Sequence, residues 1–134
     1  MKSFFSLLCI LAPLCAVGRA HAVRVLITSK SCAALPVAVQ IINHLPTAYP
    51  GDWAVLIACS DDHWHYLQRK ADAFGTSDAF TNITGKTTVI RGELFLNPPI
   101  GRPARRVLLH ELGHIPCQCG NEDTAENSAQ KLYG

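Results

Sequence analysis

The chain has 134 residues, with 12 lysines and arginines against 10 aspartates and glutamates. This length suits one domain built around one hydrophobic core. The charge is nearly balanced and no basic stripe with interleaved aromatic residues is present, which argues against a nucleic acid as partner.

Residues 1–22 are predicted to be a cleavable export signal. Lys2 supplies a positive start, an apolar stretch runs from Phe4 to Val17, and Ala20-His21-Ala22 has the small-x-small pattern of a cleavage site. Pro13 interrupts the stretch, which is also shorter than the about 20 apolar residues of a membrane span. We therefore expect a secreted or periplasmic monomer without a membrane span, whose mature part is a single domain over residues 23–134.

The mature chain begins with the pattern of a β-α-β unit. The β-branched run Val23–Thr28 predicts a buried strand, Ala33–Leu45 a helix, and Trp53–Cys59 a second buried strand. Such a unit contains a parallel strand pair with a right-handed crossover. A helix capped by Ser60 and running from His63 to Phe74 is predicted next, with Trp64 and Phe74 on its apolar face.

The segment from Ser77 to Leu96 predicts a β-hairpin. β-branched and polar residues alternate along it and are interrupted at Thr84-Gly85-Lys86, so Thr87–Leu96 is the expected second arm. Asn82 opens a glycosylation sequon, which marks an exposed turn.

Two helices are expected after the hairpin. Pro103 can open the first helix, and Pro116 and Gly120 end it. Asn121 caps the last helix, which is expected from Glu122 to Leu132. The short connection predicts that the last helix runs antiparallel beside the previous one, and the fold class is a mixed α/β domain.

Cys32, Cys59, Cys117 and Cys119 remain after removal of the signal. An even number of cysteines in an exported chain predicts two disulfides. Pairing Cys117 with Cys119 would close a very tight ring, so each is expected to bridge to Cys32 or Cys59. In the alternative, Cys117 and Cys119 are thiolate ligands of a metal ion.

The segment His110-Glu111-Leu112-Gly113-His114 carries the strongest functional signal. Residues four apart share one face of a helix, so His110 and His114 can bind one ion. Zinc is the metal expected for this pattern, and Glu111 can act as the base toward a metal-bound water. Gly113 costs about 1 kcal/mol in a helix relative to Ala, which makes sense where another backbone passes closely.

A catalytic zinc needs a third protein ligand, expected on the helix that follows. If the two helices lie antiparallel, Glu126 matches the level of the histidines. We predict His110, His114 and Glu126 as metal ligands, with Glu122 and then Asp123 as alternatives. An acid near a helix N-terminus, such as Glu122 or Asp123, is also explained by the helix dipole alone.

The motif and the helix that follows it, Asn121-Glu122-Asp123-Thr124-Ala125-Glu126, resemble the zincin metallopeptidases, and among them the glutamate-ligand branch. The resemblance covers residues 103–133. It implies that one glutamate of the last helix binds zinc while another acid orients a histidine, and either Glu122 or Glu126 can take the first role. The metzincin branch is excluded, because Cys117 and Gly120 occupy the positions of its glycine and third ligand.

The resemblance also implies an edge strand that lies antiparallel to a bound peptide, for which Thr87–Leu96 is the candidate. The expected function is therefore a zinc-dependent endopeptidase, acting on a peptide or protein substrate, with Glu111 as its catalytic residue. Tyr133, His63 and Arg91 are candidates for stabilising the oxyanion. The alternative is an exported binding module, stabilised by disulfides, in which the metal motif is structural or vestigial.

Overall fold

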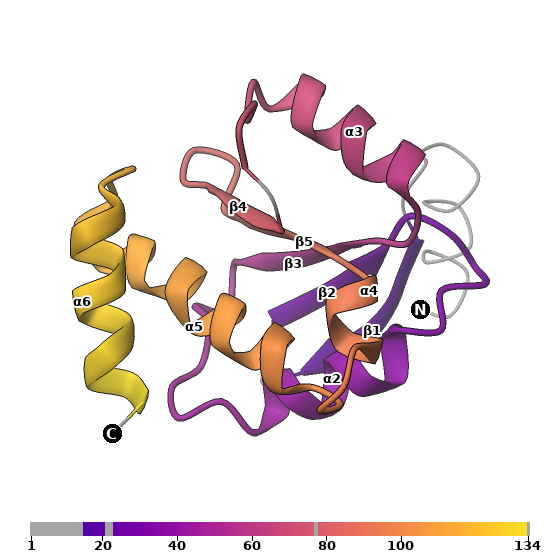
Figure 1. The fold of residues 1–134 in the computed structure, drawn as a ribbon, viewed down its shortest axis with the longest axis horizontal. Coiled ribbons are helices and arrows are strands. Elements are labelled where there is room, and N and C mark those ends of the chain that lie inside the picture. The colour runs from indigo at the N-terminus through magenta and orange to yellow at the C-terminus, as the bar shows by residue number, and fades with distance from the viewer. Residues whose placement is uncertain (1–14, 21–22, 77, 134) are drawn as a thin grey trace.

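The computed structural model describes residues 15–20, 23–76 and 78–133. It shows the expected mixed α/β architecture, with a five-stranded sheet in the order β1-β2-β3-β5-β4. Helix α3 covers one face of the sheet, and α2 and α5 cover the other, while α6 packs on α5 away from the sheet (Figure 1). The elements are β1 (Cys15–Ala20), β2 (Val23–Ile27), α2 (Leu35–Asn43), β3 (Ala54–Ala58), α3 (Asp61–Lys70), β4 (Ala79–Asn82), β5 (Thr87–Arg91), α4 (Glu93–Leu96), α5 (Arg102–Cys117) and α6 (Glu122–Tyr133).

The predicted β-α-β unit is confirmed. Strand β2 pairs in parallel with β3, in a register that joins Val25 to Val55 and Ile27 to Ile57. All five residues of β3 are buried, because helices cover both faces of the sheet at this strand. On its other side β3 pairs in parallel with β5.

Strand β1 lies within the segment predicted to be a signal. It pairs antiparallel with β2 at one edge of the sheet. Residues 1–14 and 21–22, which hold the start of that segment and most of its cleavage pattern, lie outside the described residues. If the chain is cleaved after Ala22, β2 becomes the edge strand on this side.

The hairpin is present, but its second arm is shorter than expected. Its first predicted residue, Ser77, lies outside the described residues. Strand β5 ends at Arg91, and Glu93–Leu96 form helix α4 instead of continuing the strand.

The prediction that Thr87–Leu96 supplies the edge strand is wrong. Strand β5 lies between β3 and β4, so β4 is the edge. Strand β5 pairs with β3 on one side and with β4 on the other, and its Val89 and Ile90 are accordingly 4% and 0% exposed.

Helix α3 begins as expected and ends early. The Ser60 side chain accepts a hydrogen bond from the backbone N–H of His63, and Trp64 packs on Phe80 with ring centroids 5.6 Å apart. The helix stops at Lys70, and Asp72 adopts a left-handed φ of 51°. Phe74 therefore lies outside the helix and is 69% exposed, which corrects its predicted place on the apolar face.

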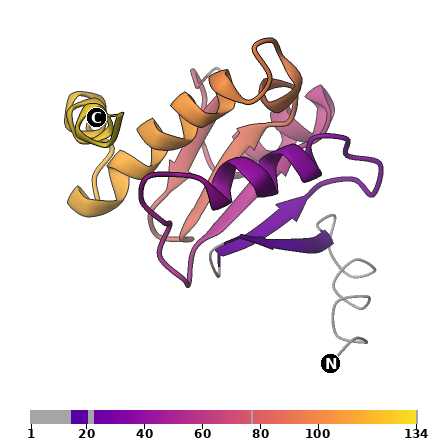
Figure 2. The same cartoon turned by 90° about the horizontal axis from the view of Figure 1, so that it is seen from below.

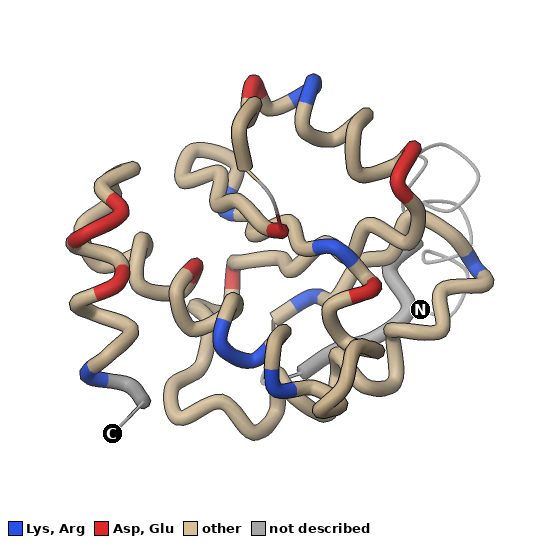
Figure 3. The backbone as a smooth tube through the Cα atoms, in the orientation of Figure 1, with Lys and Arg blue, Asp and Glu red and all other residues tan. Residues whose placement is uncertain are grey.

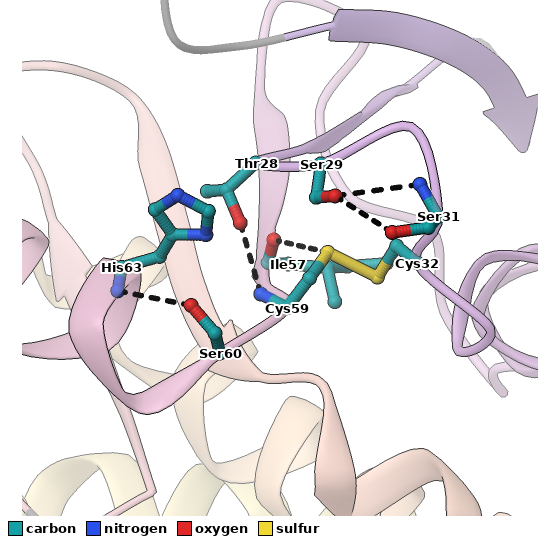
Figure 4. The surroundings of a disulfide bond; sticks show 8 residues. All are labelled: Thr28, Ser29, Ser31, Cys32, Ile57, Cys59, Ser60 and His63. Atoms are coloured by element: carbon teal, nitrogen blue, oxygen red, sulfur yellow. Dashed lines mark hydrogen bonds between the residues drawn. A yellow bond between two sulfur atoms is a disulfide. The ribbon is translucent and has the colours of Figure 1, made fainter.

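The disulfides differ from the expected pairing. Cys32–Cys59 joins the segments that follow β2 and β3 (Figure 4), and Cys117–Cys119 closes on itself between α5 and α6. Parallel neighbours β2 and β3 end side by side, which brings Cys32 and Cys59 to a Cα–Cα distance of 5.4 Å. The left-handed Gln118 reverses the chain, so that Cys117 and Cys119 come within 5.2 Å, inside the range that a disulfide spans.

The two disulfides fit an oxidising environment. Across the part of the chain that the structure describes, no helix has the length and apolar character to cross a membrane.

Candidate metal centre

Helix α5 fixes the first two candidate ligands. It begins after Gly101, which has a φ of 82°, and its apolar face buries Ala104, Leu108 and Leu109 completely in the main core. This packing sets the rotation of the helix, so that His110 is partly exposed at the side of that face. His114, one turn further on, is 6% exposed.

Helix α6 crosses α5 at very short range. A Cβ atom added to Gly113 would lie 2.3 Å from the carbonyl oxygen of Ala125, so only glycine fits at this position. Ala125 and Ala129 are fully buried in the contact. The close approach that the sequence suggested for Gly113 is therefore confirmed.

The two helices do not lie antiparallel along their length. In Figure 2 helix α6 is seen nearly end-on, whereas α5 runs across the view. Helix α6 begins at Glu122, and the Asn121 side chain caps it by accepting a 2.9 Å hydrogen bond from the N–H of Thr124. This crossing brings the first turn of α6 over His110 and His114.

His110, His114 and Glu122 form a compact group of metal-binding atoms. One atom from each lies within 4.8 Å of the others. Glu122 Oε2 is 2.8 Å from His110 Nε2, and Glu122 Oε1 is 3.7 Å from His114 Nε2. Two imidazole nitrogens and a carboxylate oxygen thus face a common point, as the ligands of a divalent cation do.

Glu126 lies on the far side of His110. Its Oε2 is 2.8 Å from His110 Nδ1, and it does not belong to the group of three. The expectation that Glu126 precedes Glu122 as third ligand requires antiparallel helices. Because α6 crosses α5, the structure brings Glu122 to the histidines and leaves Glu126 behind His110.

The environment of His110 favours a cation. Burial alone would lower the pKa of His110, but its hydrogen bonds to Glu126 and Glu122 outweigh that effect and raise the pKa. The hydrogen bond to His110 in turn lowers the pKa of Glu126. In the protonated imidazole, Nδ1–H donates to Glu126 and Nε2–H donates to Glu122, so a proton on Nε2 stands where a metal ion would bind.

His114 is oriented by the backbone of the loop that follows. Its Nδ1 is 3.1 Å from the carbonyl oxygen of Cys119. A carbonyl only accepts hydrogen bonds, so Nδ1 must carry the proton, which leaves the lone pair of a neutral imidazole on Nε2. Both histidines therefore present Nε2 to the shared point and use Nδ1 for an outer partner.

Glu111 lies beside the two histidines and is almost buried, with 6% of its surface exposed. Burial raises the pKa of its carboxyl group, while a hydrogen bond from Thr81 and the charges of His114 and His110 oppose that rise. The Thr81 hydroxyl lies 2.5 Å from Glu111 Oε2. Thr81 was not identified from the sequence, because only the folded sheet brings β4 onto α5.

These residues line one cleft of about 790 Å³. The cleft is lined by the segment 71–76, by the edge strand β4, by the loop before α6, and by His110, Glu111 and His114 of α5. The cleft is acidic: Asp72, Asp78, Glu111 and Glu122 line it, and no Lys or Arg does among the described residues. Figure 3 shows acidic positions along α6 where it meets α5. Such a field attracts cations.

Several residues considered from the sequence lie elsewhere. Cys117 and Cys119 are bonded to each other, so they offer no free thiolate to a metal. Arg91 pairs with Asp61 and Glu93 and does not line the cleft. His63 lies in the first turn of α3, where its backbone N–H donates to Ser60 (Figure 4), and it does not line the cleft. The side chain of Tyr133, the remaining oxyanion candidate, lies outside the described ones.

Comparison of the chain with models of known protein families, with curated proteins and with solved structures finds no match. The function must therefore be inferred from the geometry and chemistry of the cleft.

Proposed function

We propose that the protein is a zinc-dependent peptidase of the zincin type, with His110, His114 and Glu122 as its metal ligands. The observation that carries this proposal is the convergence of His110 Nε2, His114 Nε2 and a Glu122 oxygen on one point beside Glu111. Two imidazoles and one carboxylate are a ligand set of catalytic zinc sites, which keep a fourth position open for water.

The outer contacts of the two histidines support this ligand set. In zinc sites a ligating histidine commonly donates its second N–H to a carboxylate or a backbone carbonyl, which fixes the tautomer and the ring orientation. Glu126 is such a partner for His110, and the Cys119 carbonyl for His114. Glu126 is therefore proposed as an orienting residue and Glu122 as the ligand.

Bound zinc would lower the pKa of a coordinated water to about 7 and polarise a substrate carbonyl. Glu111 is proposed to take a proton from that water and pass it to the leaving amine. Its near burial in the cleft supports this role, since burial raises the pKa of Glu111 and makes the carboxylate a better proton acceptor.

The proposed substrate is an extended peptide bound along β4. This strand lies at one edge of the sheet that the structure describes, and it lines the cleft that contains Glu111. An exposed edge offers backbone N–H and C=O groups with which a peptide can pair as an additional strand.

Metal analysis and a protein substrate test the proposal together. We expect about one zinc per chain in the protein as purified, and lower zinc affinity in H110A, H114A and E122A. Asp123→Ala is the matched control, because Asp123 is an exposed acid of the same helical turn that belongs to no ligand group. E111Q should keep zinc and lose hydrolysis of casein.

Two results would overturn the proposal. One is zinc affinity that is unchanged in H110A and H114A, which would place any metal elsewhere. The other is a zinc-loaded wild-type protein that cleaves neither casein nor a mixed peptide library, which would favour a binding module with a structural metal.

A further inference from the structure

A row of polar side chains connects the core of the domain to Glu111. Trp53 Nε1 lies 3.4 Å from the Thr88 hydroxyl, and the Thr88 and Thr81 hydroxyls lie 3.2 Å apart across the β4–β5 pair. Thr81 then contacts Glu111 Oε2 at 2.5 Å. Nothing in the proposed ligand set uses Thr81 or Thr88.

The chemistry of these groups fixes the direction of the hydrogen bond between Thr81 and Glu111. An indole N–H can only donate, so Thr88 accepts from Trp53. An ionised carboxylate can only accept, so the single hydroxyl proton of Thr81 must point to Glu111 Oε2. Thr81 Oγ1 can then accept from Thr88.

Burial makes this bond important for the carboxylate. Trp53 and Thr88 are 2% and 0% exposed, and Glu111 is 6% exposed. Thr81 is itself only partly buried where it lines the cleft, and its hydroxyl is the side-chain donor that reaches Glu111 Oε2. A buried carboxylate oxygen without a donor is strongly disfavoured, so the bond holds the side chain in one orientation.

We propose that Thr81 is a positioning residue for Glu111, an inference that rests on the proposed peptidase function. By holding Oε2, Thr81 leaves Oε1 as the oxygen that takes the proton from water and later returns it. Thr81 keeps its own proton throughout, since Oε2 remains an acceptor when Oε1 is protonated. The edge strand thus has a second role besides offering a surface for the substrate.

A purely structural role makes different predictions. If the hydroxyl only tied β4 to α5, its loss would lower stability and disturb substrate binding and zinc together. A positioning role requires that kcat falls while KM, zinc content and fold are kept. It also requires that serine, which retains the hydroxyl, restores the rate.

The experiment compares T81V, T81S and T87V in the zinc-loaded protein with a peptide substrate. Thr87 is the matched control: it is the neighbouring threonine of β5, and its hydroxyl donates to the Gly85 carbonyl away from the cleft. A hydrogen bond to a charged group is worth roughly tenfold to a hundredfold in rate. We expect T81V to lose about that much in kcat with KM within about twofold, and T81S and T87V to stay near wild type.

Infrared spectroscopy of the zinc-free protein gives a readout that is independent of activity. The carboxylate stretch of Glu111 is assigned by subtracting the spectrum of E111Q. It should shift in T81V, return in T81S and stay unchanged in T87V. If T81V does not fold, T81A, which removes both the hydroxyl and the γ-methyl group, takes its place.

Two outcomes with an active wild type would overturn the positioning role of Thr81 and leave the peptidase function standing. One is an unimpaired kcat in T81V, and the other is an equal loss of kcat in T81V and T81S. An unshifted carboxylate band in T81V would do the same. A wild type that binds zinc but hydrolyses nothing would instead refute the peptidase function, and the role of Thr81 with it.

Discussion

The contact between Gly113 and Ala125 makes a sharp prediction for Gly113→Ala. In an isolated helix this substitution would stabilise by about 1 kcal/mol, because alanine favours the helix more than glycine does. Here the new Cβ would lie 2.3 Å from a backbone oxygen, whereas real Cβ contacts essentially never fall under 3.0 Å. The backbone of α6 must therefore move away by about 0.7 Å or more, the difference between these two distances.

The size of the effect follows from two opposing contributions. Overpacking a well-filled contact costs about 1–3 kcal/mol, which exceeds the gain in helix propensity. We expect a net loss of about 1–2 kcal/mol in the free energy of unfolding. The same displacement moves Glu122 from the histidines, and a metal site loosened by this amount is expected to lose about tenfold to a hundredfold in zinc affinity.

Urea denaturation followed by circular dichroism measures the first effect, and competition with a chelator measures the second. Gly51→Ala is the control, because a Cβ there would meet no atom of the described residues within 4 Å. A G113A protein as stable as wild type, with unchanged zinc affinity, would refute the described crossing of α5 and α6.

Three further predictions concern the surroundings of the cleft and the core disulfide. E126Q is expected to keep zinc with about tenfold lower affinity, measured by competition with a chelator. The reason is that the substitution weakens the hydrogen-bond partner of His110 Nδ1 and removes no proposed ligand. Complete loss of zinc would instead make Glu126 a ligand. In zinc-free protein the His110–Glu126 pair should stabilise the fold most between about pH 4.5 and 6.5. Because folding raises the pKa of His110, the stability that His110 contributes is lost as the pH rises through that raised pKa. Because folding lowers the pKa of Glu126, the stability that Glu126 contributes is lost as the pH falls through that lowered pKa. The urea midpoint measured in EDTA should therefore drop more between pH 5.5 and pH 8 in wild type than in E126Q, and equal drops would argue against the pair. C32S/C59S should lower the free energy of unfolding by about 3–4 kcal/mol, the loop entropy expected for a sequence separation of 27; urea titration showing a loss under about 1 kcal/mol would mean that the unfolded chain is compact without the bridge.

The sequence predicts the local elements well where a strong pattern is present. The short apolar β-branched runs of β2 and β3 are typical of buried strands, and Ser60 and Asn121 cap helices through side-chain contacts that local sequence determines. The placement of His110 and His114 on one helical face follows from helix periodicity alone.

Features that depend on tertiary packing were not predictable in the same way. Whether Glu122 or Glu126 reaches the histidines depends on the crossing of α6 over α5, which the contact at Gly113 fixes. The order of β4 and β5 in the sheet depends on which of the two strands pairs with β3. The bond from Thr81 to Glu111 spans 30 positions and has no local signature.

The proposed ligands lie within 12 residues of one another in the sequence, on two helices joined by a short disulfide-closed loop. If the proposed ligands bind zinc, a protein with a damaged β-sheet is expected to take it up as long as this helical pair survives. Under the proposed function, zinc content alone would therefore be a poor assay of correct folding. Hydrolysis would be the stricter criterion, since it would require the helices and the sheet edge to be assembled together.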